Sequence, residues 1–108
     1  MSVLNMNAEL FNQAINAEDK PALVEFWAPW CVYCRRIGPA LQKLAQQSRE
    51  RLVVGQVNID DHPALADREQ IEVVPTLVLY HKGEALGSIV APESRARIEE
   101  FLEDYLGN

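Results

Sequence analysis

Apolar residues recur at two spacings along the chain, and the two spacings separate helices from strands. Three segments place apolar residues three or four positions apart, so that these residues share one helical face. In chain order these positions are Leu10, Phe11, Ala14 and Ile15; Ile37, Leu41, Leu44 and Ala45; and Ile98, Phe101, Leu102 and Tyr105. The pattern predicts a first helix capped by Asn7, a second over about residues 31–49, and a last one that begins near Pro92 or Ser94. Pro39 should kink the second helix, because proline lacks the amide hydrogen and clashes with the preceding turn.

Short apolar runs between these helices predict four strands. The runs cover residues 22–28, 52–59, 76–80 and 85–90, and Pro75 directly precedes the third. A short helix is expected over 63–69, and the Gly-containing turn 81–84 joins the last two strands as an antiparallel hairpin. Strand–helix–strand alternation followed by a hairpin predicts an α/β fold with a mixed central sheet and helices on both faces.

Length and composition favour a single domain spanning residues 1–108. Of the 108 residues, 48% are apolar and 24% are charged, as in ordinary globular proteins. No apolar run approaches the roughly 18 residues of a membrane span, and the first nine residues lack the pattern of a signal peptide. We therefore expect a cytoplasmic monomer that does not associate with membranes.

The net charge of −6 is concentrated in the second half of the chain. Residues 1–59 carry five acidic and six basic side chains, whereas residues 60–108 carry eleven acidic and four basic ones. A surface that binds phosphate groups needs the opposite bias, so nucleic acid is not an expected partner. We interpret the acidic half as a surface that favours solubility.

The only two cysteines, Cys31 and Cys34, lie three residues apart where the first strand meets the second helix. A disulfide across so short a loop gains little from chain entropy, so it suits a bond that is repeatedly broken and reformed. Unpaired amides and the dipole at a helix N-terminus stabilise the thiolate, which is the nucleophilic form. Cys31, nearer those amides, is therefore the predicted nucleophile toward a substrate disulfide, and Cys34 the residue that resolves the mixed disulfide.

Metal binding is the main alternative for such a pair. Zinc requires about four ligands, and the other soft candidates, His62 and His81, lack the spacing of a zinc site. Residues 58–62 do not form a calcium loop, because no glycine follows at the sharp-turn position. We therefore expect no metal. An iron–sulfur cluster shared by the cysteine pairs of two copies stays open, and visible absorbance after anaerobic reconstitution would reveal it.

Four motifs together resemble the thioredoxin family. They are Val24–Cys34 (VEFWAPWCVYC) followed by Gly38-Pro39, then 57–60 (VNID), 73–77 (VVPTL) and 82–84 (KGE). Their order and spacing match the family across nearly the whole chain. The resemblance implies the thioredoxin fold, dithiol–disulfide exchange on protein disulfides, and no bound cofactor. It also implies recycling by a partner, either a reductase of the thioredoxin-reductase type or a glutathione-linked reductant.

The resemblance further implies roles around the cysteines. The Val74–Pro75 bond is expected to be cis, with the Val74 backbone pairing with an extended substrate segment. Glu25 stands where the family usually has a buried Asp, which implies proton transfer by a carboxyl whose pKa is raised by burial. Gln56 replaces a Lys that the family often has, which predicts an altered or water-mediated proton path.

A substrate-binding rim around Cys31 is implied at Trp30, Val74, Gly83 and the Val90-Ala91 pair. Ala91 stands where the family often has Gly. Trp27 is expected to pack against the site. Arg35 and Arg36 either favour the thiolate and acidic partners or lie solvated on the outer face of the helix.

Val32-Tyr33 is the largest departure from the family, where most members have Gly-Pro between the cysteines. The Tyr33 amide, which Pro would lack, can donate to a Cys31 thiolate and stabilise the reduced form. We therefore hypothesise a less negative reduction potential than that of a Gly-Pro thioredoxin.

Two other functions stay open. One is a disulfide isomerase or oxidant, which Val32-Tyr33 makes plausible. The other is a binding module that uses the apolar rim around Trp30 and Pro75, with incidental thiols.

Overall fold

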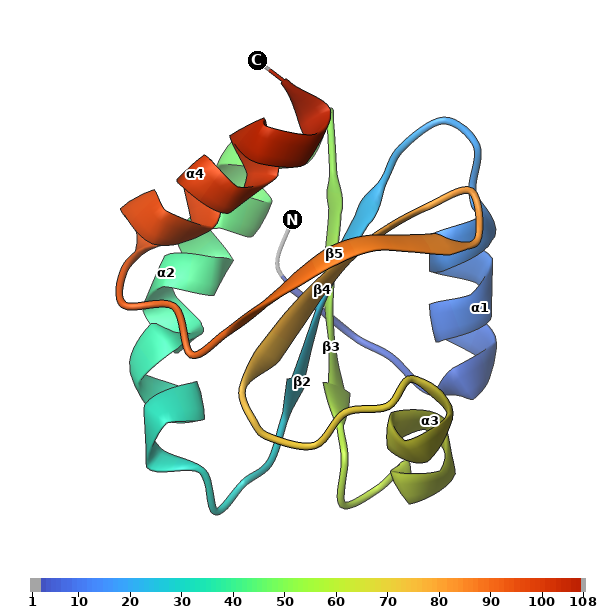
Figure 1. The fold of residues 1–108 in the computed structure, drawn as a ribbon, viewed down its shortest axis with the longest axis vertical. Coiled ribbons are helices and arrows are strands. Elements are labelled where there is room, and N and C mark those ends of the chain that lie inside the picture. The colour runs from blue at the N-terminus through green and yellow to red at the C-terminus, as the bar shows by residue number, and fades with distance from the viewer. Residues whose placement is uncertain (1–2, 108) are drawn as a thin grey trace.

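The computed structural model describes residues 3–107, which form a five-stranded mixed sheet between two layers of helices (Figure 1). In chain order the elements are β1 (Leu4–Asn5), α1 (Ala8–Asn16), β2 (Ala22–Trp27), α2 (Val32–Ser48), β3 (Val53–Asn58), α3 (Pro63–Arg68), β4 (Thr76–His81), β5 (Glu84–Val90) and α4 (Arg95–Leu106). The strand order is β1-β3-β2-β4-β5. Helices α2 and α4 cover one face of the sheet, and α1 and α3 cover the other. The α/β class, the mixed sheet and the helices on both faces are therefore confirmed.

Strand β2 is the centre of the sheet and its neighbours run in opposite directions. It pairs in parallel with β3 and antiparallel with β4. Its first five residues, 22–26, are all buried, as a continuous apolar run between two helical layers requires. The sequence pattern did not predict β1, because a strand of two residues is too short to show a period. It pairs in parallel with β3 beside Gly55 and Gln56.

Alternate residues along β2 and β4 supply two separate parts of the core. Leu23, Leu77 and Leu79 pack on the side of α2 and α4. Val24, Phe26 and Tyr80, among others, pack on the side of α1 and α3. The predicted apolar faces of the helices point into these clusters. Tyr105 differs, because its ring remains 48% exposed while resting on Phe101 at 5.2 Å between ring centroids.

Helix starts follow the predicted local rules. The Asn7 side chain accepts the amide hydrogen of Leu10 at 2.9 Å and so caps α1. Ser94 caps α4 in the same way, through the amide of Arg97. Pro39 lies inside α2 as predicted, and the helix continues beyond it to Ser48.

Strand register brings distant segments together at one end of the sheet. Phe26, near the end of β2, pairs with Thr76 at the start of β4, which in turn pairs with Val90 at the end of β5. In Figure 1 the start of α2 and the loop that leads into β4 lie at this same lower end. The cysteines, Pro75 and Ala91 therefore come from three segments that converge. None of the helices within residues 3–107 has the length and apolar character needed to cross a membrane.

Candidate active site

A disulfide between Cys31 and Cys34 lies at the N-terminus of α2, with 5.3 Å between the two Cα atoms. Cys31 has extended backbone and is the N-cap residue, and Cys34 lies in the first helical turn. One helical turn brings positions i and i+3 to the same face, which is why this spacing allows the bond. The amide of Cys34 donates to the Cys31 sulfur at 3.1 Å. The sulfur of Cys31 therefore occupies the place of a capping oxygen.

In this disulfide form the hydrogen bond to Cys31 does not come from Tyr33, whose amide is expected to donate to a Cys31 thiolate in the reduced protein. The amide that reaches Cys31 Sγ here belongs to Cys34, one residue beyond Tyr33. An N-cap side chain accepts from the second or third helical amide, and the disulfide places the sulfur over the third. The Tyr33 ring packs against the cysteine cluster, and its hydroxyl donates to the Pro92 carbonyl at 2.9 Å.

Apolar side chains surround the disulfide. Cys31 and Cys34 are 7% and 5% exposed, and they form a small buried cluster with Ala28. Trp27, Tyr33, Ile59 and Val74 pack against this cluster. The packing of Trp27 against the cysteines agrees with the place that the resemblance gave it.

The segment before β4 forms the second wall of the site. The Val74–Pro75 peptide bond is cis, as the resemblance implied. Val74 is half-buried against the cysteine cluster, and Pro75 is buried. The Thr76 hydroxyl donates to the Val73 carbonyl at 2.6 Å and so closes the turn that contains Pro75.

Four apolar side chains at this end of the molecule are more than half exposed. Trp30 is 64%, Val32 57%, Val73 51% and Val90 53% exposed. We name these four residues the apolar rim. Trp30 was predicted to contact substrate, Val90 to complete the rim with Ala91, and Val32 to lie beside the site. Val73 was not assigned to the rim, because valine usually indicates a core position. The Trp30 indole N–H donates to Asp60 Oδ1 at 3.3 Å, which restrains the exposed ring.

The two arginines after the disulfide are both exposed on α2. Arg35 Nη1 donates to the Pro29 carbonyl at 3.1 Å, so one guanidinium is turned back toward the loop before Cys31. Arg36 remains on the outer face of the helix.

Ala91 lies beside Pro75 with left-handed backbone. Its φ is +46°, a conformation that costs an alanine energy and that glycine adopts freely. Its amide donates to the Pro75 carbonyl at 3.0 Å, which holds the end of β5 against the start of β4. The predicted position of Ala91 next to the site is therefore observed.

Gly83 does not lie at the site, and this prediction was wrong. It occupies the turn between β4 and β5, where its φ is +85° and its amide donates to the Ile15 carbonyl of α1 at 2.8 Å. Because Pro75 precedes the opposite end of β4, the whole strand separates Gly83 from the cysteines (Figure 1). Gly83 instead allows the hairpin to contact α1.

Glu25 is a buried carboxyl on β2. It is 3% exposed, and within residues 3–107 its Oε2 has no hydrogen-bond partner. Burial without a compensating charge raises the pKa of Glu25 from 4.5 to about 7, because the ionised form loses its hydration. Gln56 is paired with Glu25 in the sheet register, yet its side-chain amide donates to Asn5 Oδ1 at 2.7 Å.

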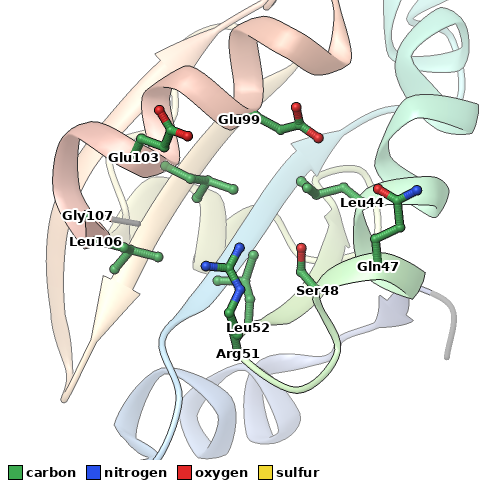
Figure 2. Close-up of a pocket in the computed structure, with 10 residues that line it drawn as sticks. Leu44, Gln47, Ser48, Arg51, Leu52, Glu99, Glu103, Leu106 and Gly107 are labelled. Carbon is green, nitrogen blue, oxygen red and sulfur yellow. The ribbon is translucent and has the colours of Figure 1, made fainter.

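The disulfide does not lie in the groove that Figure 2 shows. That groove, of about 270 Å³, lies between the C-terminal parts of α2 and α4, with Leu44, Ser48 and Leu102 among its walls. No residue of the apolar rim or of the disulfide lines it. Small-molecule sites are normally concave, so an exposed apolar rim suits a protein substrate better. In the part of the chain that the structure describes, no three metal-binding side chains are grouped as a metal site.

Replacing Ala91 by Gly should stabilise the protein. The substitution relieves the left-handed strain, partly offset by the greater freedom of glycine in the unfolded chain, so we expect a gain of about 0.5–1 kcal/mol. Urea unfolding of the disulfide form would measure it. The matched control is Ala40→Gly within α2, which should lose about 1 kcal/mol. An equal loss in both variants would contradict the strain at Ala91.

Glu25 should make stability fall as pH rises. Its folded pKa of about 7 exceeds the 4.5 of the ordinary group. Between these values the folded state keeps a proton that the unfolded state has lost, so stability is full below about pH 4.5 and declines up to about pH 7. Glu25→Gln lacks this titration. We expect its unfolding free energy, relative to wild type, to rise by about 3 kcal/mol from about pH 4 to about pH 8. A difference in unfolding free energy between the two proteins that stays constant over this pH range would contradict the buried-carboxyl interpretation.

Comparison with known proteins agrees with the geometry of this site. The family model for thioredoxin matches residues 2–104. A thioredoxin from Porphyra purpurea is 32% identical over 106 residues, which cover 98% of this chain and 99% of that protein. Thioredoxin 1 from a Nostoc strain is 34% identical over 96 residues, or 89% of this chain and 90% of the relative. A bifunctional thioredoxin reductase/thioredoxin from Mycobacterium leprae is 31% identical over 102 residues, or 94% of this chain and 22% of that longer protein. With its Trp-Cys-x-x-Cys disulfide at a helix N-terminus, the chain belongs to the thioredoxin family and is a thiol–disulfide oxidoreductase that reduces protein disulfides.

Proposed function

We propose that Cys31 attacks the substrate disulfide and that Cys34 releases the reduced product. The observation that carries this assignment is the capping position of Cys31, whose sulfur accepts the Cys34 amide at 3.1 Å. Partial positive charge at the helix N-terminus stabilises a Cys31 thiolate more than a thiol. Cys34 lies one turn further into the helix, so its sulfur receives less of this stabilisation.

The cycle transfers two electrons from the protein to its substrate. The Cys31 thiolate bonds to one substrate sulfur, the substrate S–S bond breaks, and the departing substrate thiolate takes a proton. Cys34 then loses its proton and attacks Cys31 Sγ, the mixed disulfide breaks, and the second substrate thiolate leaves and takes a proton. The substrate ends as a dithiol and the protein as the Cys31–Cys34 disulfide.

Glu25 is our proposed proton acceptor for Cys34. With its pKa raised to about 7, the carboxyl is part protonated near neutral pH and exchanges protons in either direction. Since the Gln56 amide is engaged with Asn5, the proton path would run through water rather than through a charged neighbour.

Substrate contact is proposed for Trp30, Val74 and Ala91. An extended substrate segment would pair with the Val74 backbone while apolar side chains rest on the rim. Trp27 and Pro39 have supporting roles, in packing the site and shaping α2.

The reductant is proposed to be a reductase of the thioredoxin-reductase type. The relative whose name joins thioredoxin reductase and thioredoxin in one protein supports this choice over a glutathione-linked reductant. We further propose one domain over residues 1–108, acting as a cytoplasmic monomer without bound metal or cofactor. The acidic bias of residues 60–108 supports protein partners rather than nucleic acid.

A second candidate is an oxidant or isomerase, and Val32-Tyr33 favours it. The Tyr33 amide is the second of the helix, which is a position from which an N-cap side chain accepts. In the reduced protein it would give the Cys31 thiolate a second donor that Pro lacks, and so make the disulfide more oxidising.

Cysteine variants test the assigned order of attack. In an assay in which dithiothreitol regenerates the reduced protein, we expect Cys31→Ser to be unable to catalyse insulin reduction, because the nucleophile is absent. Pre-reduced Cys34→Ser, freed of dithiothreitol, should instead accumulate a mixed disulfide with insulin, visible by mass spectrometry as a covalent adduct, because no resolving thiol is present. Turnover by Cys31→Ser would overturn the assignment, and insulin binding without any turnover by wild type would favour a binding module.

The Gly-Pro double variant, Val32→Gly with Tyr33→Pro, tests the second donor. Loss of one hydrogen bond to a thiolate, of roughly 1.5 kcal/mol, should lower the reduction potential by about 30 mV. Equilibrium titration against glutathione measures the potential. A potential that stays equal or becomes less negative in the variant would sink the oxidant interpretation, and Val32→Gly alone is the control.

A further inference from the structure

Tyr33 connects the active-site turn to a segment that is distant in sequence. Its hydroxyl donates to the Pro92 carbonyl at 2.9 Å, across 59 residues. Pro92 lies between the end of β5 at Val90 and the α4 cap at Ser94. A side chain between the two cysteines therefore holds the loop that follows the last strand.

That loop has two attachments to the site. The Ala91 amide donates to the Pro75 carbonyl at 3.0 Å, and the Pro92 carbonyl accepts from Tyr33 at 2.9 Å. Both bonds lie directly after Val90, whose side chain is 53% exposed and belongs to the apolar rim. Because Ala91 is held at φ +46°, a conformation that an alanine disfavours, the second bond helps to keep the loop in place.

The ring and the hydroxyl of Tyr33 act on different neighbours. The half-buried ring packs against both the cysteine cluster and the core cluster under α2 and α4. The hydroxyl contacts only the Pro92 carbonyl among the hydrogen bonds of residues 3–107. Tyr33→Phe therefore removes the link to the loop while keeping the packing and the backbone amide.

We propose that Tyr33 is a positioning residue for protein substrates, whose hydroxyl fixes the loop of residues 91–93 and with it the Val90 side of the apolar rim. This inference rests on the proposed function, in which the rim contacts the substrate. A rim that is already ordered loses less conformational freedom on binding, so it binds an extended apolar segment more tightly. A disulfide in a small molecule touches only the sulfurs and gains nothing from this order.

The proposal separates binding from thiol chemistry. The phenol hydroxyl bonds to a carbonyl and not to a sulfur, so its loss leaves the donors around Cys31 unchanged. We expect the reduction potential of Tyr33→Phe to equal that of wild type. Only steps that depend on a large partner should change.

The experiment compares two substrates in single turnover with pre-reduced protein. For oxidised insulin, Tyr33→Phe should raise the half-saturating concentration about fivefold, the effect of one uncharged hydrogen bond, with the limiting rate within about twofold. Reduction of an aromatic small-molecule disulfide should proceed at the wild-type rate. The matched control is Tyr105→Phe, which removes a hydroxyl from the 48% exposed ring near the end of α4 and should behave as wild type with both substrates.

Hydrogen exchange gives a second readout that does not depend on turnover. The Ala91 amide, bonded to Pro75, should exchange several-fold faster in Tyr33→Phe because the loop opens more often. Unchanged insulin saturation, equal slowing with both substrates, or unchanged exchange at Ala91 would each overturn the proposal. An inactive wild type would contradict the proposed function itself, whereas an active wild type matched by Tyr33→Phe contradicts only the role of the hydroxyl.

Discussion

The hydrogen bond from the Cys34 amide to the Cys31 sulfur joins the folding of α2 to the chemistry of the site. A helix start leaves amides without partners, and an N-cap side chain must accept from one of them. Here a sulfur does so, at 3.1 Å. The reactive atom is thereby placed where the helix has partial positive charge, so the same contact that begins the helix also stabilises a thiolate. The buried strand β2 fixes where this helix begins.

The buried carboxyl of Glu25 is a feature of the site that destabilises the fold when it is ionised. A carboxylate inside a sheet of apolar strands loses its hydration, and no charged or polar group offsets the burial of its Oε2 within the described residues. The Gln56 amide nearby is committed to Asn5. The pKa of Glu25 therefore rises to about 7, so the group is neutral enough to be tolerated and acidic enough to exchange protons. Had a cation stood at position 56, the pKa would lie lower and the carboxylate would be ionised.

Sequence patterns predicted most elements, because buried strands and amphipathic helices leave a signal over several residues. They did not reveal β1, because two residues are too few to show an alternating pattern. This strand forms through its pairing with the edge of β3. Around the site, Ala91 lies beside Pro75 and Val74 packs against the cysteines, where the family motifs placed them. The substrate contacts of the predicted rim stay a prediction. Gly83 was assigned to that rim because of its motif, although the strand between Pro75 and the turn 81–84 already places the two at opposite ends of β4.

Contacts between residues far apart in the chain were beyond prediction for a physical reason. The partner of the Tyr33 hydroxyl is a backbone carbonyl 59 residues away, and any residue type there would offer the same acceptor. Likewise, Ala91 has left-handed backbone next to its bond to Pro75, a conformation that alanine itself disfavours. The pattern of apolar residues indicates where a side chain is buried, but tertiary contacts determine the hydrogen-bond partner of its polar atom.

Tyr33 therefore combines two chemically independent parts at one position. Its amide belongs to the first turn of α2, where it can influence only the charge on sulfur, whereas its phenol belongs to the loop after β5. A Gly-Pro pair would remove both parts at once, so a change of the whole dipeptide cannot distinguish redox potential from substrate recognition. Phenylalanine at this position keeps the amide and removes only the hydroxyl. The two residues between the cysteines can thus set how readily the disulfide is reduced and, separately, how firmly the rim is held for a partner.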